Sequence, residues 1–408
     1  MKKILKLTFV FVLAVFVSGS LFSNGLNLNG IGTKANSMGG AFIGLADDYS
    51  AVYWNPAGLT QMKDQSFTVY GSFLVPKGTY KFPEAGIDTE TKSAVYPSGA
   101  IGYFKPLSDK LIIGFLGYVP AGSGAEWDGT ALAALTGGHT YTWKSMIGML
   151  TFSPVIAYKI NDVVSIGATV NINYGILKLD SPGLGQYSEN LTGTGYGATL
   201  GLMIKPSEKI SLGLTYKTPT KVTAEGEATM TGAGLLKLTV NATAQREITW
   251  PMWFGAGIAL KPMDKLTITA DIQYTNWKEL DKIGITYDNN VWNILFAGGA
   301  TFDLNWEDRI QYRFGMEYML SDALALRAGF YHDPTPAPVD TLKILLPQVD
   351  YNSITFGIGY NMGSLNLEFS FEYVMGKDRK CPLTSEEGMP GVHGMKILAP
   401  TVALSYRF

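Results

Sequence analysis

The chain has 408 residues, a formal net charge of −2 at pH 7, 47 glycines, 22 tyrosines and 20 phenylalanines, with one cysteine and three histidines. Its mean hydropathy is slightly positive, and soluble proteins seldom combine that value with so much glycine and aromatic residue. The charge excludes a strongly basic nucleic-acid-binding surface. The scattered His139, His332, His393 and Cys381 have no metal-ligand spacing, and the sequence contains no nucleophile-elbow serine or phosphate-binding glycine loop. We therefore expect neither an enzyme nor a protein with a cofactor.

Residues 1–23 have the order of a secretory signal peptide. A basic start leads into the apolar run "ILKLTFVFVLAVFV" and then into the small residues of "SGSLFS". The apolar run is shorter than the ~18 residues that a membrane-spanning helix needs, so a retained anchor is the weaker alternative. Cleavage fits Ser20 or Ser23, and Ser23 is preferred because "NGLNLNG" then begins the mature chain. The chain is predicted to be exported.

Residues 24–65 are rich in turns and offer neither a strand nor a helix of ordinary length. Near their end stands "DDYSAVYWNPAGL". Pro56 fixes its own φ and disfavours the helical region for Asn55, so a sharp bend is predicted there. Gly58 and the glycines of "SMGGAFIG" permit close backbone approach and positive φ. We interpret this segment as a plug, because the rest of the chain predicts a barrel wide enough to need filling.

From residue 66 to 408 the chain repeats one pattern with a period of two. Runs of roughly ten residues alternate apolar with small or polar residues, end at a turn and begin again. In "RIQYRFGMEY" every second residue from Ile310 to Tyr318 is apolar, and "SIGATVNINYGI", "LTITADIQY" and "LNLEFSFEY" repeat the split. The other face carries mainly Gly, Ser, Thr, Asn and Gln, whereas a soluble sandwich would have an outer face rich in Lys and Glu. The pattern therefore predicts an apolar face turned to lipid and a polar face turned to a lumen.

The connections between these runs alternate between two classes, as in outer-membrane barrels. One class is short, as in "YKINDVVSIG" and "LKPMDKLTIT". The other class is long and irregular, and covers approximately 76–93, 120–145, 180–191, 223–248, 278–307, 334–350 and 376–395. The fold class predicted is an all-β transmembrane antiparallel barrel of about fourteen strands, an even number. The count changes by two if "LLKLTVNATAQREI" extends a strand above the membrane or "VWNILFAGGATF" holds structure inside a loop.

The last predicted strand, "APTVALSYRF", carries Val402, Leu404, Tyr406 and Phe408 at alternate positions. A strand that ends on an aromatic residue resembles the signal by which outer-membrane barrels are recognised for insertion. Pairing with the first strand, near "SFTVYGSFLV", would remove the open edges that lipid cannot satisfy. We predict a location in the outer membrane of a Gram-negative-type bacterium, with outer-membrane lipid and the barrel-assembly machinery as partners.

The stretch "GLNLNGIGTKANSMGGAFIGLADDYSAVYWNPAGL" resembles the N-terminal region of the FadL family of outer-membrane transporters, which carry long-chain fatty acids and, in related members, aromatic hydrocarbons. "KLIIGFLGYVPAGSG" looks like the family's third strand, and "NWEDRIQYRFGMEYMLSDALALRAGFYHDPTPAPVD" with "LPQVDYNSITFGIGY" looks like its distal part. The resemblance implies that residues 24–65 form a hatch inside a barrel of residues 66–408. The hatch residues that it implies are Asp47, Asp48, Asn55, Pro56, Ala57 and Gly58. Asp350 is followed by Tyr351 where family members often have an arginine, which weakens any carboxylate-binding role there.

The resemblance also implies capture of a hydrophobic ligand by outer loops, transfer to an interior pocket and lateral release through the barrel wall. The lateral gate would lie in the third strand, where Gly114 and Gly117 weaken the strand and Pro120 cannot donate to a ladder. The apolar side chains offered for capture are Trp127, Leu132, Leu135, Tyr141 and Trp143. Alternatively, this loop only covers the barrel mouth, and the Asn-Pro-Ala-Gly turn belongs to a permanently closed plug.

Lumen-facing cations offer a site for a carboxylate head group, because arginine binds carboxylates in a bidentate geometry. The candidates are Arg309, Arg313 and Arg327, with Lys217 and Arg407 on the same face. Pairing with Asp271, Glu317, Glu368 and Glu372 is the competing use of these cations. We expect a hydrophobic small-molecule ligand, a fatty acid or a hydrocarbon, and a monomeric protein. The rival functions are a general diffusion porin and a plugged structural barrel, and residues 24–65 argue against an open porin.

Overall fold

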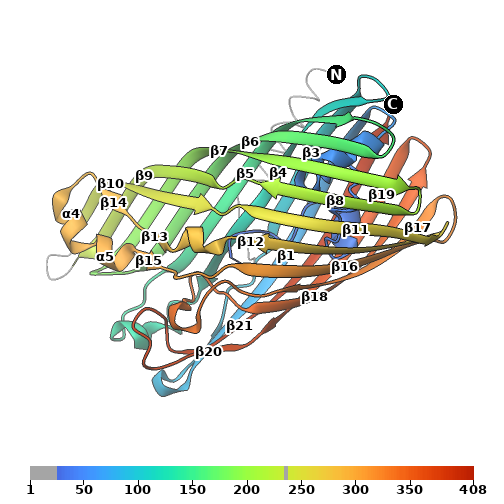
Figure 1. Cartoon of the computed structure of the whole chain (residues 1–408). Coiled ribbons are helices and arrows are strands. Elements are labelled where there is room, and N and C mark those ends of the chain that lie inside the picture. Colours follow the sequence, from blue (N-terminus) through green and yellow to red (C-terminus); the bar gives the residue numbers. More distant parts are fainter. Residues whose placement is uncertain (1–24, 234–237) are drawn as a thin grey trace.

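The computed structural model describes residues 25–233 and 238–408. The predicted signal peptide, residues 1–23, lies outside the described residues. Within them the chain forms a closed antiparallel barrel of 14 strands (Figure 1), which confirms the predicted fold class. Among the described residues, no helix combines the length and the apolar character needed to cross a membrane.

Two of the wall strands are each interrupted once, so that β8 continues as β9 and β10 continues as β11. In order, the wall consists of β1 (Ser66–Phe82), β3 (Tyr96–Pro106), β4 (Leu111–Trp127), β5 (Trp143–Lys159), β6 (Val164–Pro182), β7 (Gln186–Ser207), β8 (Ile210–Lys217) with β9 (Thr220–Ala233), β10 (Leu238–Trp250) with β11 (Trp253–Met263), β12 (Leu266–Thr275), β16 (Arg309–Met319), β17 (Leu324–Asp333), β18 (Asp350–Met362), β19 (Leu365–Lys377) and β21 (Gly391–Arg407).

The remaining elements are short and fall into two groups. The N-terminal group consists of α2 (Thr33–Ser37), α3 (Ala51–Trp54) and the 3-10 helix η1 (Pro56–Gln61). The long connections contain η2 (Pro83–Ala85), β2 (Ile87–Glu90), η3 (Ala133–Thr136), η5 (Trp277–Leu280), β13 (Lys282–Ile283), β14 (Thr286–Tyr287), α4 (Asn290–Leu295), α5 (Ala297–Ala300), β15 (Phe302–Asp303), η6 (Val339–Thr341) and β20 (Arg379–Cys381).

The first and last strands close the barrel, as the sequence predicted. β1 pairs with β21 from Ser66 opposite Arg407 to Lys81 opposite Val392. The Phe408 N–H extends this contact by donating to the Gln65 carbonyl at 2.9 Å. Both strand edges are therefore paired, which the hydrocarbon core of a membrane requires because it offers no water to backbone groups.

The wall strands alternate between exposed apolar and buried polar side chains. In β16 the outward Tyr312, Phe314 and Met316 are 45% to 52% exposed, whereas the inward Gln311 and Arg313 are buried. The outward row is the face that meets lipid, and the inward row faces the lumen. This is the arrangement predicted from the period of two.

Two segments predicted to be long loops are mostly strand. β6 ends at Pro182 and β7 begins at Gln186, so residues 180–191 contain only a tight turn between two long strands. Residues 223–248 belong largely to β9 and β10. The outward side chains of these extensions are polar, as at Thr192, Glu225 and Glu247, because the strands continue past the apolar band into water. The alternation of apolar residues therefore ends before the hydrogen-bonded pairing of these strands ends.

A buried ion pair fixes the connection between β12 and β16 to these strand extensions. Arg246 Nε lies 2.7 Å from Glu189 Oε1, and both side chains are 0% exposed. The same guanidinium donates to the carbonyl of Ile283 at 3.2 Å and to that of Ala300 at 2.8 Å. Because each of these groups would be costly to bury without a partner, the connection is held in one position above the lumen.

We predict that Val402→Arg lowers the free energy of unfolding by about 2–4 kcal/mol, because it puts a charge near the middle of the lipid-facing band. Val402 is 43% exposed on β21. The control is Thr192→Arg, an outward residue of β7 above the band, where the change should stay within about 0.5 kcal/mol. Denaturant titration of both variants in lipid vesicles measures the difference, and equal stabilities would contradict the assigned lipid face.

Candidate functional site

Residues 25–65, here called the N-terminal segment, pack against strands from opposite sides of the barrel. Helix α2 contacts β17, β18, β19 and β21, whereas η1 contacts β4, β5, β6 and β7. In Figure 1 the blue helices of this segment lie among the strands, towards the end of the barrel that carries the short turns. Nearly all of its side chains up to Leu59 are buried. The segment therefore crosses the lumen and joins two halves of the wall.

The Asn-Pro-Ala turn links separate parts of the N-terminal segment through the side chain of Asn55. Asn55 is extended, with φ −165° and ψ 96°, and Pro56 begins η1. The Asn55 side chain accepts a hydrogen bond from Ala57 N at 3.2 Å and donates to the carbonyls of Ile43 and Leu202, each at 3.0 Å. Leu202 belongs to β7, so one buried amide connects two parts of the segment to the barrel wall.

A second hydrogen bond links the N-terminal segment to the barrel wall at β12. Asp271 of β12 accepts a hydrogen bond from Ile43 N at 2.6 Å through its Oδ2 atom. Gly58 allows the segment to fold on itself here, because a Cβ at that position would overlap the Ala46 carbonyl. The segment is therefore held by directed hydrogen bonds in addition to its buried surface.

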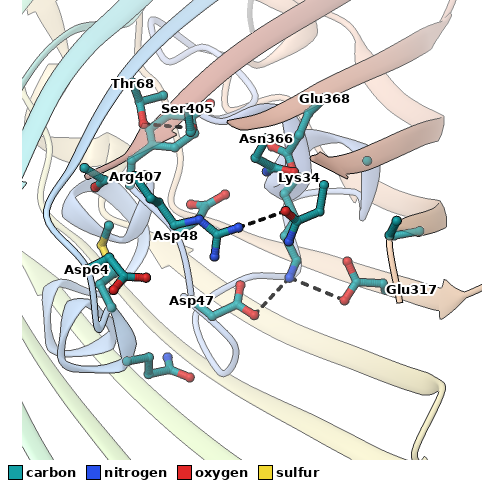
Figure 2. Close-up of a pocket in the computed structure, with 18 of the residues that line it drawn as sticks. Lys34, Asp47, Asp48, Asp64, Thr68, Glu317, Asn366, Glu368, Ser405 and Arg407 are labelled. Carbon is teal, nitrogen blue, oxygen red and sulfur yellow. Dashed lines mark hydrogen bonds and ion pairs between the residues drawn. The ribbon is translucent and has the colours of Figure 1, made fainter. Parts of the chain in front are cut away.

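A chain of ion pairs connects the N-terminal segment to β16, β17 and β19 (Figure 2). Lys34 Nζ lies 2.9 Å from Asp47 Oδ2 and 3.3 Å from Glu317 Oε1. Arg327 continues the chain, with contacts of 2.6 Å to Glu317 and 3.0 Å to Glu368. These charges line a cavity of about 390 Å³ at the short-turn end of the barrel.

Asp48 borders the same cavity without an ion pair among the described residues. Its Oδ1 atom accepts hydrogen bonds from Ser50 N at 2.7 Å and from Ser50 Oγ at 2.6 Å. Burial raises the pKa of the Asp48 carboxyl to about 7, and nearby Glu368 acts in the same direction, while the Ser50 hydroxyl opposes the rise. Asp48 is thus hydrogen-bonded to the neighbouring Ser50, whereas Asp47 forms an ion pair with Lys34.

A second cavity, of about 1060 Å³, lies at the same end between the N-terminal segment and β5, β7 and β8. Thr60 and Gln61 of the segment line it together with Ser165, Lys205 and Ser211 of the wall. Its lining is mostly polar or charged. Both cavities at the short-turn end of the lumen are therefore lined mainly by polar and charged residues.

Strand β4, which contains the predicted gate residues, leaves the barrel surface part-way along its length. It pairs with β3 only as far as Tyr118 opposite Ala100. Its ladder with β5 shifts register between Tyr118 and Ala121, across Pro120. Residues 118–125 are all buried instead of alternating, so this part of β4 is covered on both faces. We call the missing β3–β4 pairing above Tyr118 the β3–β4 interruption.

The predicted glycines of β4 differ in their surroundings. A Cβ at Gly114 would overlap Phe104 and the Tyr103 carbonyl, so only glycine fits the close β3–β4 contact there. A Cβ at Gly117 would meet nothing nearer than 3.7 Å, so its role is not steric. Both precede the interruption, which begins after Tyr118.

The N-terminal segment occupies the edge that β3 leaves open. Leu28 N donates to the Pro120 carbonyl at 3.0 Å, and Gly122 N donates to the Leu26 carbonyl at 2.9 Å. Asn27 and Ala121 form an antiparallel bridge. Pro120 has no N–H of its own, so its carbonyl is its only backbone contribution. Residues 26–28 thus complete the hydrogen bonding of β4 in place of a neighbouring strand.

The five side chains predicted to capture ligand lie in or against the interior apolar cluster. Trp127, Leu132 and Trp143 are buried, and Leu135 and Tyr141 are partly buried against them. Trp127 Nε1 donates to the Ile344 carbonyl at 2.9 Å. These residues are therefore packed in the interior of the barrel in this structure, and their role in ligand capture stays a prediction.

The three candidate head-group arginines have different partners. Arg309 lies 2.7 Å from Glu307, and Arg327 holds Glu317 and Glu368. Arg313 has no carboxylate within 4 Å in the described part of the chain. Its guanidinium lies 5.3 Å from the Trp54 ring and 4.9 Å from the Tyr331 ring, and its buried Nε atom has no hydrogen-bond partner. The competing prediction, pairing with Asp271, Glu317, Glu368 or Glu372, thus describes Arg327, whereas Arg309 pairs with Glu307 instead.

Sequence reasoning missed how deeply the connection between β17 and β18 enters the barrel. Ile344 and Val349 of this connection are 0% exposed within the apolar cluster. Gln348 accepts a hydrogen bond from Gly25 N at 2.7 Å and donates to the Gly25 carbonyl at 2.9 Å. The only sequence signal is the apolar run "KILLPQV", which is unusual for an exposed loop.

The family model described as outer membrane protein transport protein (OMPP1/FadL/TodX) matches residues 14–396. The chain belongs to this FadL/TodX family. Its place in the outer membrane is thereby confirmed, as is the predicted family. Members of the FadL/TodX family are transporters of hydrophobic compounds rather than enzymes.

Other relatives agree with this FadL/TodX membership. An outer membrane protein of Neisseria meningitidis is 24% identical over 88% of this chain and 87% of its own length. A 47 kDa outer membrane protein of Pasteurella multocida is 22% identical over 96% of each chain. The crystal structure of the Pseudomonas putida toluene transporter TodX has a TM-score of 0.78 at 17% identity, covering 95% of this chain and 100% of that one. The Ralstonia pickettii toluene transporter TbuX gives 0.73 at 18%, covering 94% and 99%.

We predict that Asn55→Ala speeds amide hydrogen exchange of residues 40–60 by about tenfold to a hundredfold, because it removes buried hydrogen bonds worth about 1–3 kcal/mol in total. The matched control is Asn289→Ala, which removes another asparagine cap, that of α4 in a long connection. Mass spectrometry of exchanged peptides measures both. Unchanged exchange in the Asn55 variant would contradict its role as a link within the N-terminal segment.

Proposed function

We propose that this protein moves hydrophobic small molecules, long-chain fatty acids or related hydrocarbons, across the outer membrane by lateral release through the wall. The observation that carries the proposal is the β3–β4 interruption, where β4 turns inward and residues 26–28 take the place of a neighbouring strand. Such a wall can open without breaking the ladders between its long strands, because the contacts to be released are those with residues 26–28 and the short contact of Thr91 and Lys92 with the end of β4. Water-filled pores give no comparable reason for an interrupted wall.

In this proposal residues 1–23 are a signal peptide, residues 24–65 are the hatch and residues 66–408 are the barrel. The ligand enters between the long connections and passes into the apolar cluster lined by Trp127, Leu132 and Trp143. Movement of the hatch then releases Leu26 and Leu28 from β4. The ligand leaves sideways through the interruption into lipid, so it never crosses the polar cavities at the short-turn end.

The apolar cluster supports a ligand, or a ligand tail, without charge. It contains a large set of buried apolar side chains from the wall and the connections, and the ion pair next to it, Arg246–Glu189, is already satisfied. A carboxylate head group is supported by a different observation. Arg313 is buried, stacked between Trp54 and Tyr331, and free of a carboxylate partner among the described residues. A fatty acid would use both features, and a hydrocarbon only the first.

The porin alternative is disfavoured by what fills the lumen. The N-terminal segment and residues 344–349 occupy it from both ends. We further propose that the barrel functions as a monomer, because β1 and β21 of one chain close it. The barrel-assembly machinery would recognise the terminal strand that ends at Phe408.

The proposal predicts that the purified barrel binds a long-chain fatty acid and a neutral hydrocarbon of matched length, and that a small sugar neither binds nor permeates. Arg313→Gln should weaken binding of the acid about tenfold or more, because it removes a charge-assisted contact, and leave the hydrocarbon unchanged. Arg309→Gln is the control, since its guanidinium is paired with Glu307. Calorimetric titration measures binding. Sugar permeation without binding of either ligand would contradict the proposal and indicate a general diffusion porin.

The release route predicts that a disulfide between residues 27 and 121 blocks uptake but not binding. In a Cys381→Ser background, Asn27→Cys with Ala121→Cys joins two residues that already form a bridge. Ligand uptake into vesicles should fall when the pair is oxidised and recover on reduction. The control pair is Ile354→Cys with Tyr373→Cys, which face each other in the continuous β18–β19 ladder. Equal uptake by the oxidised and reduced forms would refute lateral release at this place.

A further inference from the structure

Three lysines form a row on the outer surface of the barrel, on three neighbouring strands. Lys77 of β1 lies directly opposite Lys396 of β21 in the ladder. Lys396 in turn lies opposite Met375 of β19, and Lys377 is the next residue on the same face of that strand. All three side chains are exposed and point away from the lumen. We call Lys77, Lys396 and Lys377 the lysine row.

The lysine row lies at the long-loop edge of the lipid-facing band. The outward residues of β1 below Lys77 are apolar or glycine, beginning with Phe67 and ending with Val75. The ten-residue step from Phe67 to Lys77 spans about 34 Å along the strand, or about 26 Å along the barrel axis at a tilt of about 40°. The apolar band of an outer-membrane barrel is about 25 Å tall. The ammonium groups therefore lie at the depth of lipid head groups in the outer leaflet.

The charge of the lysine row is only partly compensated by the protein. Like charges directly opposite on neighbouring strands are destabilising. Lys77 is 59% exposed and lies 2.5 Å from Glu90. Within the described ranges, neither Lys396 nor Lys377 has a carboxylate within 4 Å. An anion from outside the protein would remove this repulsion.

The opposite side of the barrel has no such row among the described residues. There the outward positions above the apolar band are Thr194 and Thr192 on β7. Lys178 of β6 lies beside Thr192 on this face, and Lys221 of β9 pairs with Glu247 of β10 at 2.6 Å. What distinguishes the seam between the first and last strands is that its outward lysines lie next to one another on three neighbouring strands.

We propose that the lysine row binds the phosphate groups of a phosphorylated glycolipid in the outer leaflet of the outer membrane. The lysines supply point charges at phosphate depth. Phe73 of β1 and Leu398 of β21, 44% and 40% exposed, lie below them where the acyl chains would run. The lysine row lies on the outer face of the wall, whereas the apolar cluster of the proposed transport route lies inside the barrel. It would hold a lipid against the strand seam that closes the barrel.

The test compares binding of bisphosphorylated lipid A with that of its fully dephosphorylated form to the folded barrel in neutral detergent, by native mass spectrometry. Lys377→Gln with Lys396→Gln should weaken binding of the phosphorylated lipid about thirtyfold, and Lys396→Gln alone about fivefold, because each lysine near a lipid surface contributes a similar electrostatic term. The control is Lys209→Gln with Lys265→Gln, at the short-turn end, which should bind like the parent protein. Heat-modifiable migration verifies that each variant is folded.

Three results would overturn the proposal. The first is equal binding of the phosphorylated and dephosphorylated lipids by the parent protein. The second is an equal loss of binding in the control variant. The third is thermal stabilisation by inorganic phosphate alone that matches stabilisation by the lipid, because it would indicate a free-anion site.

Discussion

Backbone hydrogen bonding at membrane depth is the constraint on which the rest of this structure depends. Hydrocarbon offers no partner for an N–H or a carbonyl, so the chain must close its sheet completely. It does so between β1 and β21, and the closure leaves no free edge there. Besides the short breaks between β8 and β9 and between β10 and β11, the described wall departs from this rule at β4, where Leu26 and Leu28 supply backbone partners. The interrupted wall and the N-terminal segment therefore require each other.

The same constraint divides the lumen into two chemically different parts. Towards the short turns, ion pairs such as Lys34–Glu317 and Arg327–Glu368 surround polar cavities, and the charges compensate one another within the protein. Towards the long connections, apolar side chains of the wall pack against Ile344 and Val349. The boundary between the two parts lies near the depth at which β4 turns inward.

The sequence was sufficient to predict the barrel, the pairing of its ends and the bend at Asn55, because these depend on local periodicity and on proline geometry. It assigned 180–191 and 223–248 to long loops and raised a strand extension only as an alternative for "LLKLTVNATAQREI", because side chains above the membrane face water on the outside and lose the apolar contrast. Nor could it decide the partners of the lumen arginines. Arg327 and Arg313 occupy equivalent lumen-facing positions in the sequence pattern. Arg327 pairs with two glutamates, whereas Arg313 lies against two aromatic rings, because their partners come from segments distant in sequence. Burial of Trp127 likewise depends on Ile344, more than two hundred residues away.

The two-sided docking of the N-terminal segment has a consequence for the order of folding. Thr355 Oγ1, for example, donates to the Ser37 carbonyl at 2.9 Å, across 318 residues of sequence. Contacts of this separation form slowly, because closing so long a loop costs a large conformational entropy. The part of the protein that is synthesised first therefore makes its final contacts with strands that are synthesised last.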